Sequence, residues 1–139
     1  MWHSDPAAAA AAAAVVGRDD DLKSLVVAYY RMVDTDDIDG FVALFEPDLR
    51  YDRPGAGQIV GRAALERFYR AQEPVASRVH VLSACLREGR HLAAHGVAER
   101  VSLDGQQTTI GFADFFTVSD AGLFAYRRTF FHVPFAASS

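Results

Sequence analysis

The chain has 139 residues, half of them hydrophobic and 12% aromatic, which is typical of one domain with a single core. Its net charge of −4 argues against a nucleic-acid partner, because neutralising phosphates needs clustered Lys and Arg. No apolar run approaches the roughly 20 residues that span a bilayer, so no membrane partner is expected either. The single cysteine, Cys85, excludes an internal disulfide and fits a cytoplasmic location.

The chain opens with an Ala-rich arm over residues 1–18, in which alanine occupies every position from Ala7 to Ala14. Alanine is the best helix former, so this arm is expected to be a frayed helix or a flexible extension without chemistry of its own. Residues 19–139 are expected to form one domain. An acidic first turn and apolar residues at helical spacing predict its first helix over residues 19–34.

Two further helices are predicted in the first half of the domain, over Ile38–Phe45 and over residues 62–72. Between them, alternation over residues 49–53 predicts a short strand. The glycine-containing segment 55–61 is expected to be an ordinary loop, because it lacks the lysine and the strand–helix–strand surroundings of a phosphate-binding loop.

From Ser77 onward the hydrophobic period changes from helical to alternating. Four runs of this kind, separated by turn signals that contain glycine, predict strands over about residues 78–87, 91–103, 107–118 and 122–132. Helices followed by a strand meander are typical of the α+β class. We therefore expect a curved, mostly antiparallel sheet wrapped around about three helices.

Three segments, residues 38–45, 60–69 and 111–116, resemble the SnoaL-like branch of the nuclear-transport-factor-2-like superfamily and bacterial ketosteroid isomerase. The resemblance covers about residues 20–132. It implies a cone-shaped, cystatin-like α+β fold with one ligand pocket, and a homodimer formed through the outer face of the sheet. This superfold hosts isomerases, cyclases, hydrolases, dehydratases and plain binding proteins, so the resemblance implies a fold more than a reaction.

The resemblance to the isomerase implies an oxyanion site made by Tyr29 on the first helix and Asp114 on a late strand. The position of the isomerase's general base holds Arg53, and strand alternation should turn the neighbouring Asp52 to the opposite face. Steroid isomerisation by the usual mechanism is therefore not expected.

The limonene-epoxide-hydrolase branch gives a similar result. Tyr51 and Arg100 match two residues of its catalytic set, but Ser102 and Arg128 stand where that set has aspartates. Epoxide hydrolysis by that machinery is not expected.

The predicted pocket is an aromatic cup with one carboxylate and two or three guanidinium groups. Its lining is expected to be Tyr29, Tyr51, Arg53, Phe68, Tyr69, Phe112, Asp114, Phe116, Tyr126, Arg128 and Phe130, with Arg100 added if its strand faces inward. A surplus of positive charge in such a cavity predicts a hydrophobic, oxygen-rich or anionic aromatic ligand, because buried unpaired charge is costly. His80 could reach the mouth of the cavity, although a satisfied or exposed histidine is the more common case. No cofactor and no metal site are expected.

The leading hypothesis is a cofactor-free isomerase, cyclase or dehydratase acting on a polyketide-like carbonyl compound. Its predicted catalytic residues are Asp114, which moves a proton or donates a hydrogen bond to the oxyanion, assisted by Tyr29, Arg53 and Arg128. The other lining residues would bind the substrate. Three alternatives stay open: a non-catalytic binding protein, a structural dimeric subunit whose cavity is filled by its own side chains, and a purely structural Asp–Arg pair at Asp114.

Overall fold

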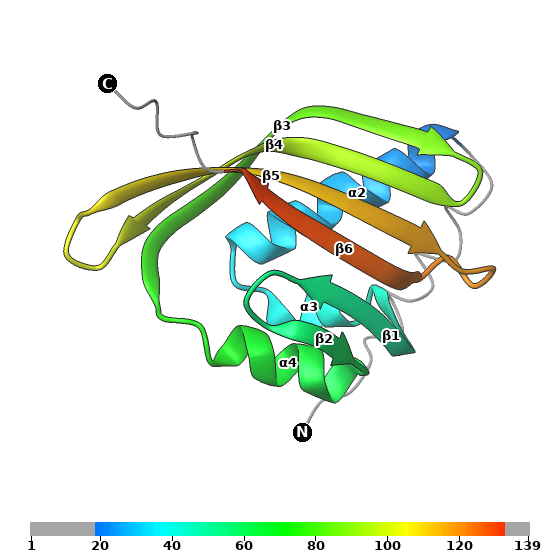
Figure 1. The fold of residues 1–139 in the computed structure, drawn as a ribbon, viewed down its shortest axis with the longest axis horizontal. Helices are drawn as coiled ribbons and strands as arrows, with labels where there is room; N and C mark the ends of the chain where they lie inside the picture. The colour runs from blue at the N-terminus through cyan, green and yellow to red at the C-terminus, as the bar shows by residue number, and fades with distance from the viewer. Residues whose placement is uncertain (1–18, 133–139) are drawn as a thin grey trace.

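A computed structural model describes residues 19–132, in which three helices pack against one curved six-stranded sheet (Figure 1). The expected α+β class is confirmed. The Ala-rich arm predicted over residues 1–18 and the last seven residues of the predicted domain, 133–139, lie outside the described residues. Among the described residues, none of the helices has the length and apolarity that crossing a bilayer would require.

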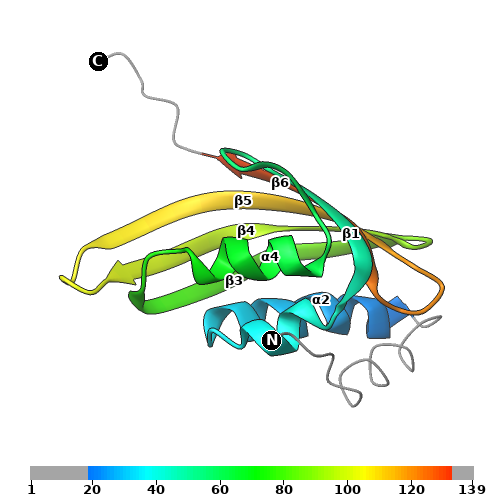
Figure 2. The same cartoon turned by 90° about the horizontal axis from the view of Figure 1, so that it is seen from below.

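The first described helix, α2 (Asp19–Asp34), has the predicted bounds and runs along one side of the sheet (Figure 2). In the turn that follows the helix, Asp36 has a left-handed backbone (φ 56°). Two backbone bonds close the turn: Asp36 donates to the Val33 carbonyl at 3.1 Å and Asp37 to the Met32 carbonyl at 2.9 Å. This is the hydrogen-bond pattern of a Schellman cap, which stops the helix directly beside the sheet.

The second helix, α3 (Ile38–Val42), is shorter than the predicted Ile38–Phe45. Its N-cap Asp37 accepts a hydrogen bond from the Gly40 backbone N–H at 3.0 Å, as expected. Phe45 does not continue the helix, because it starts strand β1 (Phe45–Arg53) and pairs with Phe124 at the start of the last strand in the chain. The third helix, α4 (Arg62–Arg70), agrees with its prediction to within two residues.

The prediction of a loop over residues 55–61 is wrong in part, because Gly57–Val60 forms a strand, β2, antiparallel to β1. Gly55 and Gly57 adopt positive φ angles of 84° and 66°, which permits the tight reversal between the strands. The side chain of Ile59 is buried opposite Tyr51. One apolar residue in a four-residue strand is too weak a pattern to identify from sequence.

The remaining strands follow the four predicted runs: β3 (Val75–Glu88), β4 (His91–Ser102), β5 (Gln107–Val118) and β6 (Phe124–His132). The sheet order is β2-β1-β6-β5-β4-β3. All neighbours are antiparallel except β1 and β6, which run parallel, so the expectation of a mostly antiparallel sheet is confirmed. The helices lie on one side of this sheet (Figures 1 and 2).

Two β-bulges determine which side chains face the helices. In β6 the pairing passes from Val118–Phe124 to Thr117–Tyr126, so β6 holds one extra residue, Ala125. In β3 one extra residue, Ala76, lies at the start of the strand, and the bulge within the strand is at Ser83, between the pairs that Leu82 and Ala84 make with β4. Because side chains alternate along a strand, each extra residue reverses the face on which all later residues lie.

The outer face of the sheet carries exposed large apolar side chains, including Phe115 and Phe130, whose rings meet edge to face at 5.9 Å. This is the face through which a homodimer is expected, and the dimer stays a prediction.

The bulge in β3 provides a test of the fold. An added Cβ on Gly96 would lie 1.9 Å from the Val81 carbonyl oxygen, so Gly96→Ala requires the backbone of the bulge to move. We expect a loss of about 1–3 kcal/mol in the free energy of unfolding, measured by urea denaturation. Thr109→Ala, at an exposed position of β5, is the control and should stay within about 0.5 kcal/mol of wild type. Equal stability of the two variants would contradict the close approach of β3 and β4.

Candidate active site

A cavity of about 270 Å³ lies between the helices and the sheet. Every strand except β2 contributes to its wall, together with α2, Tyr69 of α4 and Gln72 after α4. The volume is near the lower end of the range for small-molecule sites. A structural subunit with a cavity filled by its own side chains is therefore not what the structure shows.

The buried centre of this wall is an ion pair between Asp114 on β5 and Arg127 on β6, which are 1% and 5% exposed. Arg127 donates from Nη2 to Asp114 Oδ2 at 2.9 Å and from Nε to Oδ1 at 3.1 Å. The Tyr30 hydroxyl also donates to Oδ2, and the Thr129 hydroxyl to Oδ1. A carboxylate has about four acceptor positions, so all of those on Asp114 are occupied by protein donors.

Arg127 is held on its other side by tyrosines. Its Nη1 donates to the hydroxyls of Tyr29 and Tyr69, the latter at 3.0 Å, and its guanidinium lies 4.5 Å from the ring centroid of Tyr51. Burial alone would lower the pKa of Arg127, but the Asp114 carboxylate and the nearby phenol oxygens outweigh burial and raise this pKa well above its usual range. Arg127 is thus a fixed positive charge.

Burial raises the pKa values of Tyr29, Tyr30 and Tyr51 above the usual tyrosine range, and the Asp114 carboxylate raises that of Tyr30 further. These three phenols therefore stay protonated at neutral pH. They act as hydrogen-bond donors and not as bases.

Counting hydrogens shows which hydroxyl is available to a ligand. Thr129 gives its hydrogen to Asp114, so Tyr51, whose hydroxyl lies 2.8 Å from that of Thr129, donates to it. Tyr29 and Tyr69 both accept from Arg127 and lie 3.1 Å apart, so only one of their hydrogens can lie between them. Tyr29 is 1% exposed and Tyr69 is half-buried at the cavity, so we assign the free hydrogen to Tyr69.

Arg53 on β1 is the second cation of the cavity wall. Its guanidinium lies between the rings of Phe68 and Phe131, 4.9 Å from each centroid. Its Nε is buried without a hydrogen-bond partner, the one such side-chain atom within residues 21–132. Arg100, exposed on β4, also lines the cavity, and no ion pair joins either arginine to an acid of the described chain.

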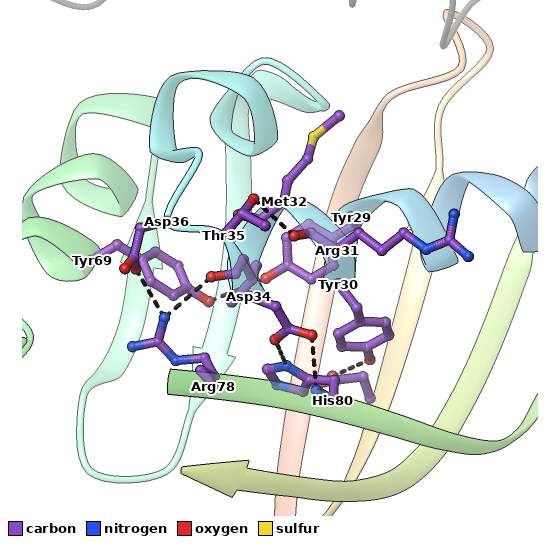
Figure 3. A network of polar contacts seen from close by, with 12 residues as sticks. Tyr29, Tyr30, Arg31, Met32, Asp34, Thr35, Asp36, Tyr69, Arg78 and His80 are labelled. Carbon is purple, nitrogen blue, oxygen red and sulfur yellow. Dashed lines mark hydrogen bonds and ion pairs between the residues drawn. The ribbon is translucent and has the colours of Figure 1, made fainter. Parts of the chain in front are cut away.

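The third polar group comes from β3, beneath the end of α2 (Figure 3). His80 lines the cavity, and Asp34 accepts from its backbone N–H at 2.8 Å and lies 2.5 Å from its Nδ1. Arg78 donates to Asp36 at 2.9 Å and to the Val33 carbonyl at 3.1 Å, which ties the cap of α2 to the same strand.

Most of the predicted lining residues do line the cavity: Tyr29, Tyr51, Arg53, Tyr69, Arg100, Phe112 and Asp114. Their roles stay predictions.

Three predicted lining residues on β6 face the other way. On the outer side of the sheet, the Tyr126 hydroxyl donates a hydrogen bond to Asp52 at 2.5 Å. This hydrogen bond is the main reason that the pKa of Asp52 is lowered. Arg128 and Phe130 are exposed and contact each other. The extra residue Ala125 reverses the alternation, so Arg127, Thr129 and Phe131 face the cavity instead. The prediction of an inward Arg128 was therefore right in residue type and wrong by one position.

Two further predicted lining residues, Phe116 and Phe68, do not line the cavity. Phe116 is 1% exposed in the core and its ring packs against the Arg127 guanidinium, and the ring of Phe68 packs against the Arg53 guanidinium. Tyr30, the partner of Asp114, is not among the predicted site residues, because Tyr29 and Tyr30 are adjacent on a helix and both fit an apolar face. No three His, Cys, Asp or Glu side chains of the described part are placed to hold a metal ion.

The amino-acid sequence of residues 26–127 matches the family described as SnoaL-like domain. The chain belongs to this family and has the cone-shaped nuclear-transport-factor-2-like fold expected from the resemblance. No curated protein sequence matches the chain significantly.

Solved structures agree on the fold at low sequence identity. The epoxide hydrolase/cyclase-like enzyme SalBIII, with a role in pyran ring formation in the polyether salinomycin, is 21% identical, with a TM-score of 0.70 over 82% of this chain and 92% of its own. A putative ketosteroid isomerase from Kribbella flavida is 21% identical (TM-score 0.68, 87% and 84%). TerC, co-crystallized with polyporic acid, is 20% identical (TM-score 0.68, 80% and 91%). These identities support the fold and not a shared reaction.

The buried ion pair makes a sharp prediction. Asp114→Asn removes the charge that compensates Arg127, and breaking one partner of a buried pair typically costs about 3–5 kcal/mol. We expect a loss of that size in the free energy of unfolding, measured by urea denaturation. Asp52→Asn, which removes an acid hydrogen-bonded on the outer side of β1, is the matched control and should stay near wild type. A stable Asp114→Asn variant would show that Arg127 does not depend on this carboxylate.

Proposed function

We propose that the chain is an enzyme that isomerises, cyclises or dehydrates a hydrophobic, oxygen-rich carbonyl compound by acid–base chemistry of its own side chains. The observation that carries the proposal is the guanidinium of Arg53, which lies between aromatic rings in the wall of the cavity that Tyr69 also lines and has no acid partner in the described chain. This arrangement suits an oxygen atom that gains negative charge during the reaction.

The charge balance of the wall supports an acidic ligand. Asp114 neutralises Arg127 and Asp36 pairs with Arg78, which leaves Arg53 and Arg100 with no acid to pair with in the described chain. A buried donor without an acceptor costs about 1–3 kcal/mol. An enolate, phenolate or carboxylate oxygen in the cavity would compensate the charge of the Arg53 guanidinium, and the flanking aromatic rings suit a planar ligand.

The proposal changes the role of Asp114. A carboxylate whose four acceptor positions are filled has no free position for a substrate proton, and as a charged group it cannot donate a hydrogen bond. We therefore assign Asp114 a positioning role: it orients Tyr30 and Arg127, and Arg127 orients Tyr69. The oxyanion is stabilised by Tyr69 and Arg53.

The described activities of structural relatives are compatible with this proposal. They include pyran ring formation by SalBIII, a putative SnoaL-like polyketide cyclase and a putative ketosteroid isomerase. Aldol-type ring closure and isomerisation of a ketone both pass through negative charge on a carbonyl oxygen, which is the charge that Arg53 and Tyr69 would hold.

The alternative is a binding protein that uses the same cavity without catalysis. It is favoured by the saturated state of Asp114 and by an arginine at the position where the isomerase has its base. The two functions differ in whether the cavity accelerates enolisation.

Binding of the ligand class is tested by calorimetric titration with 2-naphthoate and with its neutral methyl ester. We expect Arg53→Met to weaken binding of the anion by about 10–100-fold, since a hydrogen bond to a charged group contributes about 1.5–3 kcal/mol. Binding of the ester should change little. Arg50→Met, at an exposed position of the same strand, is the control with the same charge change. Equal loss for both ligands, or none for either, would remove Arg53 from the site.

Catalysis is tested with 2-tetralone, an enolisable aromatic ketone, by following exchange of its α-hydrogens in D₂O by NMR. We expect the wild type to accelerate exchange and Tyr69→Phe to slow it by about 100-fold, the usual effect of removing one oxyanion donor. Tyr126→Phe, on the outer side of the sheet, should exchange at the wild-type rate. A wild type no faster than buffer would replace the enzyme with the binding protein.

A further inference from the structure

The geometry points to His80 as the group that exchanges a proton with the ligand, with Asp34 as its positioning residue. This inference rests on the proposed function and supplies the base that the proposal lacks, since Asp114 has no free acceptor. His80 lines the same cavity as Arg53 and Tyr69.

The hydrogen bonds fix the tautomer of His80. An ionised carboxylate only accepts, so the 2.5 Å contact between Asp34 Oδ1 and His80 Nδ1 requires a hydrogen on Nδ1. In the neutral ring Nε2 is then the atom with a free lone pair. Within the described chain Nε2 has no hydrogen-bond partner, and it is not among the fully buried atoms without one, so it is open to a ligand.

The ring is also held in place. It packs at a tilt against Tyr30, with centroids 5.0 Å apart and an interplanar angle of 31°, and meets Phe112 edge to face at 5.2 Å and 77°. The backbone N–H of His80 donates to the second oxygen of Asp34 at 2.8 Å, so one carboxylate orients both the strand and the ring (Figure 3). Both side chains of the pair are less than one-fifth exposed.

The position of Asp34 argues against a role in helix stability. It is the last residue of α2, where the negative end of the helix dipole disfavours a carboxylate. The Schellman turn that follows directs the end of the helix to β3, where the carboxylate meets His80. The unfavourable charge is thus offset by the histidine that it orients.

In the step that we infer, the Nε2 lone pair of His80 takes a proton from the carbon next to the substrate carbonyl. The electrons of the broken C–H bond form the C=C bond of an enolate, and the negative charge moves to oxygen, at Arg53 and Tyr69. His80 becomes imidazolium beside Asp34. Return of the proton to another carbon completes an isomerisation, and its transfer to a departing β-hydroxyl completes a dehydration.

The first arm of the test uses 2-tetralone exchange together with 2-naphthoate affinity. We expect His80→Gln to slow exchange by about 100-fold or more, the usual range for a general base, while naphthoate affinity stays within about twofold. Asp34→Asn should also slow exchange, to a smaller extent, with affinity retained. His95→Gln, an exposed histidine on β4, is the control and should behave as wild type. Exchange at the wild-type rate in His80→Gln would overturn the inference.

The second arm needs no ligand. Long-range ¹H–¹⁵N spectra of the free wild type, with His80 assigned through His80→Gln, should show that the neutral form of the ring carries its hydrogen on Nδ1. Protonation on Nε2 would overturn the inference. The failures are distinguishable: a wild type that neither binds 2-naphthoate nor exchanges 2-tetralone contradicts the proposed function, whereas an active wild type with an active His80→Gln contradicts only the role of His80.

Discussion

The buried ion pair between Asp114 and Arg127 is the interaction on which the arrangement of the cavity depends. Burying two charges is costly, and the cost is offset only when the remaining donors and acceptors are also satisfied. Here the partners come from separate elements: Tyr29 and Tyr30 from α2 and Thr129 from β6, which all bond one member of the pair. The pair therefore fixes the distance between the helix and the sheet. The same contacts fill the acceptor positions of Asp114, which is why we assign it a positioning role.

The polar groups of the cavity wall are of two kinds, because the Asp114–Arg127 network fills its own hydrogen bonds and other groups of the wall have no protein partner. Atoms of the network are hydrogen-bonded to each other and hold shape. The Arg53 guanidinium has no acid partner and His80 Nε2 has no hydrogen-bond partner in the described chain, and these, with the Tyr69 hydroxyl, are the groups that remain for a ligand. One group that holds negative charge and one that moves a proton, facing a single cavity, are the minimum needed for enolisation without any other participant.

Much of the fold was predictable because helical and alternating periods differ strongly. The bounds of α2 agree with the prediction, and β4 and β5 agree to within one residue. The site was less predictable, because the side of the sheet to which a side chain points depends on bulges that leave no signal in the sequence. The extra residue Ala125 moves Arg127 inward and Arg128 outward, and two adjacent arginines cannot be separated by composition. Asp34 and His80 are 46 residues apart, and only the turn after α2 brings them together.

A crystal structure of the chain with 2-naphthoate bound would test the central claim most directly. The account predicts the ligand carboxylate within hydrogen-bond reach of the Arg53 guanidinium and the Tyr69 hydroxyl, the aromatic rings near His80, and the Asp114–Arg127 pair unchanged. A ligand that displaces Asp114 from Arg127, or whose carboxylate binds away from Arg53, would contradict it and would return Asp114 to the role of the reacting group.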